Sequence, residues 1–175
     1  NLRLHGVFSE AVVARSGYAG CVTYLADDQG RLYTRADIAP GDAGRAAGAY
    51  DAPAGIGDAV LPHRELSRSD LFVSNATASA SGRLGAGKDV RAVRASEPSS
   101  WDHPALAARW QRSLDDQLAE IAAQDGERDD DRPAGWDLLF AEGTVFGGSF
   151  VVGDRALQVT TAHDHAILVA RDNVT

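Results

Sequence analysis

The sequence is poor in the residues that make cross-links and membrane spans. It holds one cysteine and no methionine, and a single cysteine excludes both a framework of internal disulfides and a zinc finger built on paired cysteines. No apolar run approaches the roughly 20 residues that a helix needs to cross a bilayer. The chain opens at Asn1 without the basic and then apolar stretches of a signal peptide. We therefore expect a cytoplasmic protein without a membrane segment, and the missing initial methionine indicates a processed end or a piece of a longer chain.

Lysine is almost absent, so arginine carries nearly all of the positive charge. Residues 1–98 carry 11 basic and 11 acidic side chains, whereas residues 99–175 carry 6 basic and 14 acidic ones and hold the whole net charge of −8. Tight nucleic-acid binders gain affinity by releasing counterions from phosphates, which requires clustered cations. The acidic half would repel a nucleic acid, and it would repel an anionic membrane for the same reason. The charge therefore disfavours both as partners.

The sequence does have enough length for one core and a series of short extended segments. Its 175 residues suit one domain better than two, so we interpret 1–175 as a single β-rich domain. Apolar residues in Leu2–Val13, interrupted at Gly6 or near Ser9, predict a strand with a kink or bulge. Cys21–Ala26 and Arg31–Thr34 flank a turn and predict a hairpin. Further strands are expected at Gly57–Leu61, Leu71–Ser74, Asp89–Ala95, Asp137–Glu142, Thr144–Phe146, Phe150–Val152, Leu157–Ala162 and Ala166–Ala170, and helical turns at Ala43–Tyr50 and His63–Ser69.

Residues 103–124 carry the clearest helical pattern. Pro104 suits a first helical turn, where its missing N–H would be unpaired in any case. The apolar residues recur at helical spacing and form one stripe: Leu106, Trp110, Leu114, Leu118 and Ile121. Burying five such side chains contributes on the order of 10 kcal/mol gross, at roughly 2 kcal/mol each, so this helix must pack on another element. We predict an α+β fold: a mostly antiparallel β-sheet, or a partly open β-barrel of short strands, with one long amphipathic helix at about 103–124 packed on it.

Residues 125–135 form the most polar stretch of the chain. They begin Asp-Gly-Glu-Arg-Asp-Asp-Asp-Arg, which is too polar to bury. We expect an exposed acidic loop here, between the helix and the last strands.

The densest group of metal-ligating residues is His163-Asp164-His165 near the end of the chain. On a strand, His163 and His165 would point to the same face, where two imidazoles can share a metal ion, with His5 or an acidic residue as a third ligand. Because the flanking runs resemble strands, the same residues also fit the solvated tip of a hairpin. They define one candidate divalent-metal site; apart from this alternative we expect no cofactor.

A second candidate site is the basic cluster of Arg83, Lys88, Arg91 and Arg94. On a β-barrel such residues can follow a single-stranded nucleic-acid backbone. Sites of that kind usually add aromatic side chains for base stacking, and residues 76–100 contain none. A salt-bridged outer face is the competing interpretation.

Complete catalytic motifs are missing from the sequence. There is no Gly-x-Ser-x-Gly elbow and no His-Glu-x-x-His, and Cys21 lies in an apolar strand without an adjacent histidine, as an inert core thiol would. Asn75 and Asn173 begin Asn-x-Thr sequons, which we interpret as chance matches. We therefore expect a non-catalytic binding or assembly domain of a larger protein or complex, with a protein partner or a second copy of itself. The alternatives are a metal-binding protein or metal-dependent enzyme using His163 and His165, and a single-stranded nucleic-acid-binding barrel.

Overall fold

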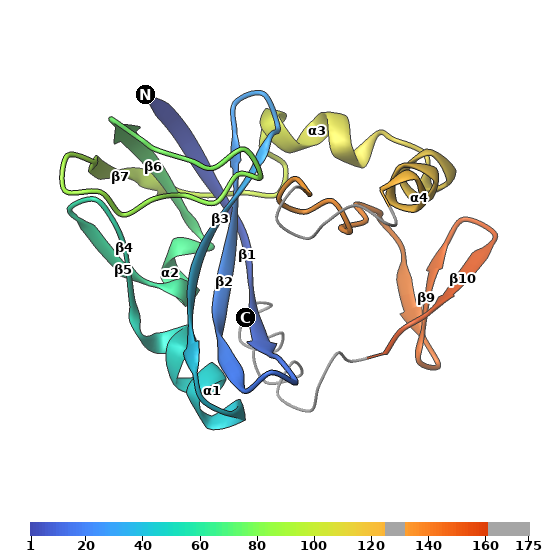
Figure 1. Ribbon diagram of the computed structural model, residues 1–175. Coiled ribbons are helices and arrows are strands. Elements are labelled where there is room, and N and C mark those ends of the chain that lie inside the picture. Colours follow the sequence, from blue (N-terminus) through green and yellow to red (C-terminus); the bar gives the residue numbers. More distant parts are fainter. Residues whose placement is uncertain (125–131, 161–175) are drawn as a thin grey trace.

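The computed structural model describes residues 1–124 and 132–160. Their centre is an antiparallel sheet whose strands are β1 (Leu2–Val13), β2 (Tyr18–Asp27), β3 (Leu32–Pro40), β6 (Ser69–Ser74) and β7 (Arg91–Pro98). These five strands lie in the order β3-β2-β1-β6-β7 (Figure 1). The expected α+β class is confirmed: the fold is β-rich, and the sheet does not close into a barrel.

The hairpin of β2 and β3 lies where alternation and turn residues predict it. Asp27 ends β2, and its Oδ1 accepts hydrogen bonds from the backbone N–H groups of Gln29 and Arg31. Gly30 has a φ of +77°, a conformation that is accessible to glycine at little cost. The side chain of Asp27 thus folds the turn that also carries Asp28.

One face of the sheet is covered by the segment between β3 and β6. This segment contains α1 (Ala43–Asp51), β4 (Pro53–Ile56), β5 (Ala59–Pro62) and α2 (His63–Leu66), and β4 and β5 pair as a hairpin. Side chains from these elements join the sheet in the main core, which includes Leu4, Leu25, Ile56, Leu66 and Leu71. Burial of this leucine-rich set is the principal force holding the layers together.

Residues 75–90, between β6 and β7, extend from that end of the sheet to β3 at the other end and then return. Leu84 N–H donates to Thr34 O at 2.8 Å, and Thr34 N–H donates to Gly82 O at 3.0 Å. Leu84 is buried in the main core beside Tyr33. The loop therefore covers one end of the sheet by contacting β3, although it adds only isolated bridges to it.

The expected single helix at 103–124 is two helices, α3 (Pro104–Trp110) and α4 (Leu114–Ala123). Ser113 causes the break: its Oγ accepts a hydrogen bond from Asp116 N–H and donates one to the Asp116 carboxylate, which starts a new helix at Leu114. Only Leu106 of the predicted stripe is completely buried, while Leu118 is 37% exposed. The prediction of one continuous helix was wrong because the stripe continues through the cap. None of the helices in residues 1–124 and 132–160 is long and apolar enough to cross a bilayer.

The last described segment carries a small separate sheet of β8 (Thr144–Phe146), β9 (Ser149–Val152) and β10 (Arg155–Gln158). An ion pair of 2.6 Å between Arg155 and Asp115 joins β10 to α4. The strand expected at Asp137–Glu142 is absent, because the side chain of Gln117 hydrogen-bonds the N–H and C=O of Phe140 at 2.7 and 2.9 Å. A side-chain amide takes the place of a partner strand there.

Candidate functional site

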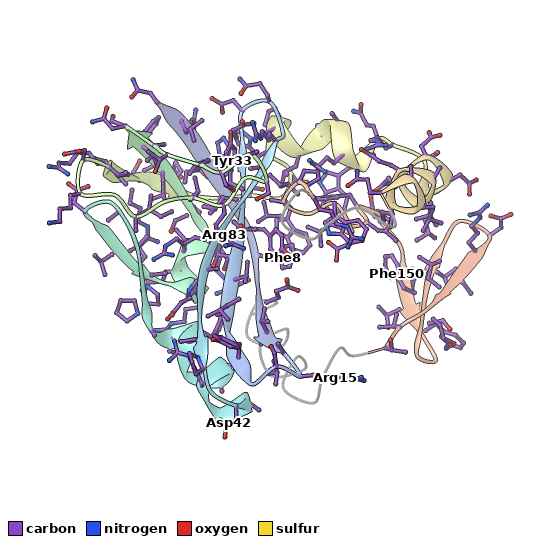
Figure 2. The ribbon with its side chains drawn as sticks, in the orientation of Figure 1. Phe8, Arg15, Tyr33, Asp42, Arg83 and Phe150 are labelled. Atoms are coloured by element: carbon purple, nitrogen blue, oxygen red, sulfur yellow. The ribbon has the colours of Figure 1, made fainter. Side chains whose placement is uncertain are left out.

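The two candidate sites proposed from sequence differ in whether the structure describes them. His163 and His165 lie outside the described residues. Arg83 lies beside β3 (Figure 2), whereas Arg91 and Arg94 are on β7 at the opposite end of the strand order.

Two side chains of the basic cluster, Arg91 and Arg94, have local partners. Arg91 donates to the carbonyl oxygens of Lys88 and Val90, and Arg94 forms an ion pair of 3.2 Å with Glu65. The described arrangement is that of separate basic side chains on a loop and an edge strand.

The cluster with the strongest potential for chemistry is elsewhere, at the centre of β1. His5 is completely buried and lies opposite Asp70 of β6 in the strand register. Asp70 is 5% exposed. Carboxylates are rarely buried to this degree without a partner. Burial of Asp70 beside His5 therefore lowers the stability of the fold unless the carboxylate is paired.

A bulge in β1 positions the third member of this cluster. The register of β1 against β2 shifts between Gly6 and Phe8, close to the kink expected at Gly6. The carbonyl oxygens exposed by the bulge accept hydrogen bonds from Ser99 Oγ and from Trp101 Nε1. These contacts fix the approach to α3, and the ring of His103 then stacks on that of His5 with centroids 3.5 Å apart.

His5 has carboxylates near both of its ring nitrogens. Nε2 lies 2.9 Å from Asp28 Oδ1 and is hydrogen-bonded to it, and this bond holds the pKa of the Asp28 carboxyl below its usual value. Nδ1 lies 2.9 Å from Asp70 Oδ2, but this contact lacks hydrogen-bond alignment, and Asp70 Oδ1 also has no hydrogen-bond partner. The guanidinium of Arg3 lies 3.7 Å from Asp70 Oδ2 and forms an ion pair with it.

His103 has two roles at this position. It is the residue before the first turn of α3, and its Nδ1 accepts a hydrogen bond from Ala105 N–H at 3.1 Å. Burial, and then the neighbouring His5, lower the pKa of His103. Because Nδ1 is occupied as an acceptor, Nε2 is the nitrogen available for another partner.

Together, His5, Asp70 and His103 offer three ligand atoms that all lie within 4.8 Å of one another. Two imidazole nitrogens and one carboxylate oxygen are a donor set suited to zinc and related divalent ions.

A second buried polar group lies beneath α2, away from the metal-capable cluster. Ser9 Oγ donates to the carbonyl oxygen of His63 at 3.0 Å, Ser9 and Thr23 hydroxyls lie 2.7 Å apart, and Thr23 Oγ1 lies 2.7 Å from His63 Nδ1. Since each hydroxyl has one proton, all three bonds form only if Thr23 donates to Ser9 and His63 Nδ1–H donates to Thr23. His63 Nε2 is buried and has no hydrogen-bond partner, and burial lowers the pKa of His63 to about 4, which favours the neutral ring.

The sequence identified only part of the metal-capable cluster. It named His5 as a possible third ligand, but Asp70 and His103 reach it through strand pairing and a bulge, which are contacts between distant segments. Two features of the sequence could have indicated these residues: Asp70 directly precedes the apolar run of β6, and His103 directly precedes Pro104. Comparisons with known protein families, curated proteins and solved structures gave no match, so the cluster is interpreted from its own geometry.

Proposed function

We propose that the chain is a non-catalytic binding or assembly domain that meets its partner through β6 and β7. The observation that carries this proposal is a cross-strand pair of large apolar side chains, Phe72 and Val93. They are 51% and 66% exposed. Single exposed apolar residues are ordinary on a protein surface, but two placed directly opposite each other form a continuous apolar patch at the end of the sheet.

The open edge of β7 adds hydrogen-bonding capacity to this patch. Among the described residues, no strand pairs with β7 on the side away from β6. Ala92 N–H points to that side, where it donates to Asp58 Oδ1 at 2.7 Å. Alternate residues of a strand direct their backbone groups to the same edge, so those of Arg94 also face outward. Asp58 occupies the N–H of Ala92, but the edge has no partner strand, and an edge of this kind is a template for another chain.

A second copy of this chain is the simplest partner. Two copies related by a two-fold axis would bring the same patch and the same open edge together. Both copies would then bury Phe72 and Val93, whose exposure in the single chain is otherwise unfavourable. The surrounding Arg91 and Arg94 discourage unselective pairing, as charged residues on edge strands commonly do.

Sedimentation equilibrium of the wild-type chain and of a Phe72→Ser/Val93→Thr variant tests the proposal. We expect a concentration-dependent dimer that the double variant shifts to monomer, with unchanged secondary structure because both side chains are already largely exposed. Phe146→Ser is the matched control, since Phe146 is 79% exposed on β8, away from the patch. A wild-type monomer at all concentrations, or a dimer lost only in Phe146→Ser, would contradict this assignment.

A further inference from the structure

We propose that His5, Asp70 and His103 form a binding site for a divalent transition-metal ion of the zinc class, with Asp28 orienting His5. This inference does not depend on the assembly role of β6 and β7. It rests on the buried polar atoms at the centre of β1, on their ligand chemistry and on the way the fold brings them together.

The first argument is that two buried ligand atoms lack hydrogen-bond partners. His5 Nδ1 and Asp70 Oδ1 belong to side chains that are almost completely buried, and neither makes a hydrogen bond, although Nδ1 lies 2.9 Å from Asp70 Oδ2. A buried polar group without a hydrogen-bond partner lowers the stability of the fold, and a charged one lowers it more. A metal ion placed among these atoms would pair both of them at once.

The second argument is the partner on the far side of the His5 ring. Nε2–H donates to Asp28 Oδ1, which leaves Nδ1 as the lone-pair nitrogen in neutral imidazole. Metal-ligating histidines in proteins commonly donate their other N–H to a carboxylate in this way, which fixes the ring and makes the ligating nitrogen more basic. Asp28 is therefore a positioning residue that does not itself touch the ion.

The third argument is the donor set. A site of two imidazoles and one carboxylate favours zinc and neighbouring divalent ions, whereas magnesium and calcium prefer sites made entirely of oxygen atoms. Three protein ligands leave a fourth position, which water takes in sites of this type. The cluster comes from β1, β6 and the start of α3, so a bound ion would join three separate parts of the chain.

Binding requires a small adjustment of the rings. Tetrahedral ligands about 2.1 Å from zinc lie roughly 3.4 Å from one another, so the 2.9 Å contact of His5 Nδ1 with Asp70 Oδ2 must open slightly. The rings of His5 and His103 are stacked, with an interplanar angle of 29°, so their nitrogen lone pairs lie in nearly parallel planes and do not converge on one point. His103 must therefore turn about its side-chain bonds, which shortens the distance from its Nε2 to the ion.

Zinc binding to the purified full chain, measured by isothermal titration calorimetry and by metal analysis after dialysis, tests the site. Asp70→Asn removes the carboxylate at constant shape. His103→Asn removes the Nε2 ligand and retains a residue that caps helices well, so α3 is preserved. Asp28→Asn leaves all three ligands in place. His163→Ala/His165→Ala removes the histidines outside the described residues and is the matched control.

We expect one equivalent of zinc in the wild type and in the His163→Ala/His165→Ala control, and none in Asp70→Asn or His103→Asn. Asp28→Asn should bind zinc 10- to 100-fold more weakly, as partners of metal ligands do when they are removed. Unchanged circular dichroism of the variants confirms that they fold. Zinc binding that survives in Asp70→Asn and His103→Asn, or is lost only in the control, would overturn the proposal. So would an absence of zinc binding by the wild type.

Discussion

The buried His63 makes the stability of this fold depend on pH in a specific direction. Burial lowers its pKa from the ordinary value of 6.5 to about 4, because a charged imidazole has no water around it there. Asp37 acts in the opposite direction and Arg35 in the same direction as burial. The hydrogen bond from His63 Nδ1–H to Thr23 forms in either charge state of the ring, so burial of the imidazole accounts for the preference for the neutral form.

The sign follows from proton binding by the two states. The unfolded chain takes up a proton on His63 as the pH falls through 6.5, whereas the folded chain resists protonation until about pH 4. Between these values the unfolded state binds more protons, so the free energy of unfolding falls as the pH falls. A lowering of the pKa from 6.5 to about 4, at about 1.4 kcal/mol for each unit, corresponds to roughly 3.5 kcal/mol in total, of which roughly 3 kcal/mol is lost by pH 4. The full contribution is present above pH 6.5.

Urea unfolding of the wild type and of His63→Gln at several pH values between about 7.5 and 4 isolates this contribution. Glutamine does not titrate in that range, so the difference in unfolding free energy between the two proteins removes the effects of all shared groups. We expect the advantage of the wild type to shrink by roughly 3 kcal/mol across the range. A difference that stays constant within about 0.5 kcal/mol would refute the reasoning.

Three further predictions concern the helices, the hairpin turn and the cysteine. Ser113→Ala should lower the unfolding free energy by about 1 kcal/mol, measured by urea unfolding, because it removes the cap of α4; an unchanged value would show that the break at 111–113 has another cause. Gly30→Ala should destabilise by about 1–3 kcal/mol in the same assay, because a Cβ would stand 2.6 Å from Ala105 O at a φ of +77°; a stability within 0.5 kcal/mol of wild type would contradict this contact. Burial, together with the nearby Glu10, raises the pKa of Cys21 to about 12, so a thiol reagent should label the chain only after urea unfolding; rapid labelling of the folded chain would contradict the buried position.

The fold could be predicted where the pattern is local. Alternating apolar residues and turn residues correctly predicted the hairpin of β2 and β3. The helical turns predicted at Ala43–Tyr50 and His63–Ser69 correspond to α1 and α2. The break between α3 and α4 was missed because Ser113 interrupts the backbone without interrupting the apolar stripe. The false strand at Asp137–Glu142 has the composition of a strand, but Gln117 supplies the hydrogen bonds that a neighbouring strand would otherwise make.

The candidate site was less predictable than the fold. His5 was visible as a potential ligand, but its partners depend on which strand lies next to β1 and on where a bulge exposes two carbonyl groups. Neither is encoded in the spacing of histidines and aspartates along the chain. His163 and His165 are near neighbours in the sequence, so their spacing alone predicts a shared metal ion. Asp70 and His103, in contrast, approach His5 only when the sheet and α3 are assembled.

Anomalous X-ray diffraction from crystals of the zinc-loaded protein, recorded on both sides of the zinc absorption edge, tests the metal centre most directly. The account predicts one strong peak bounded by His5 Nδ1, Asp70 and His103 Nε2, with Asp28 still hydrogen-bonded to His5. A peak held by other residues, or no peak at this cluster, would contradict it.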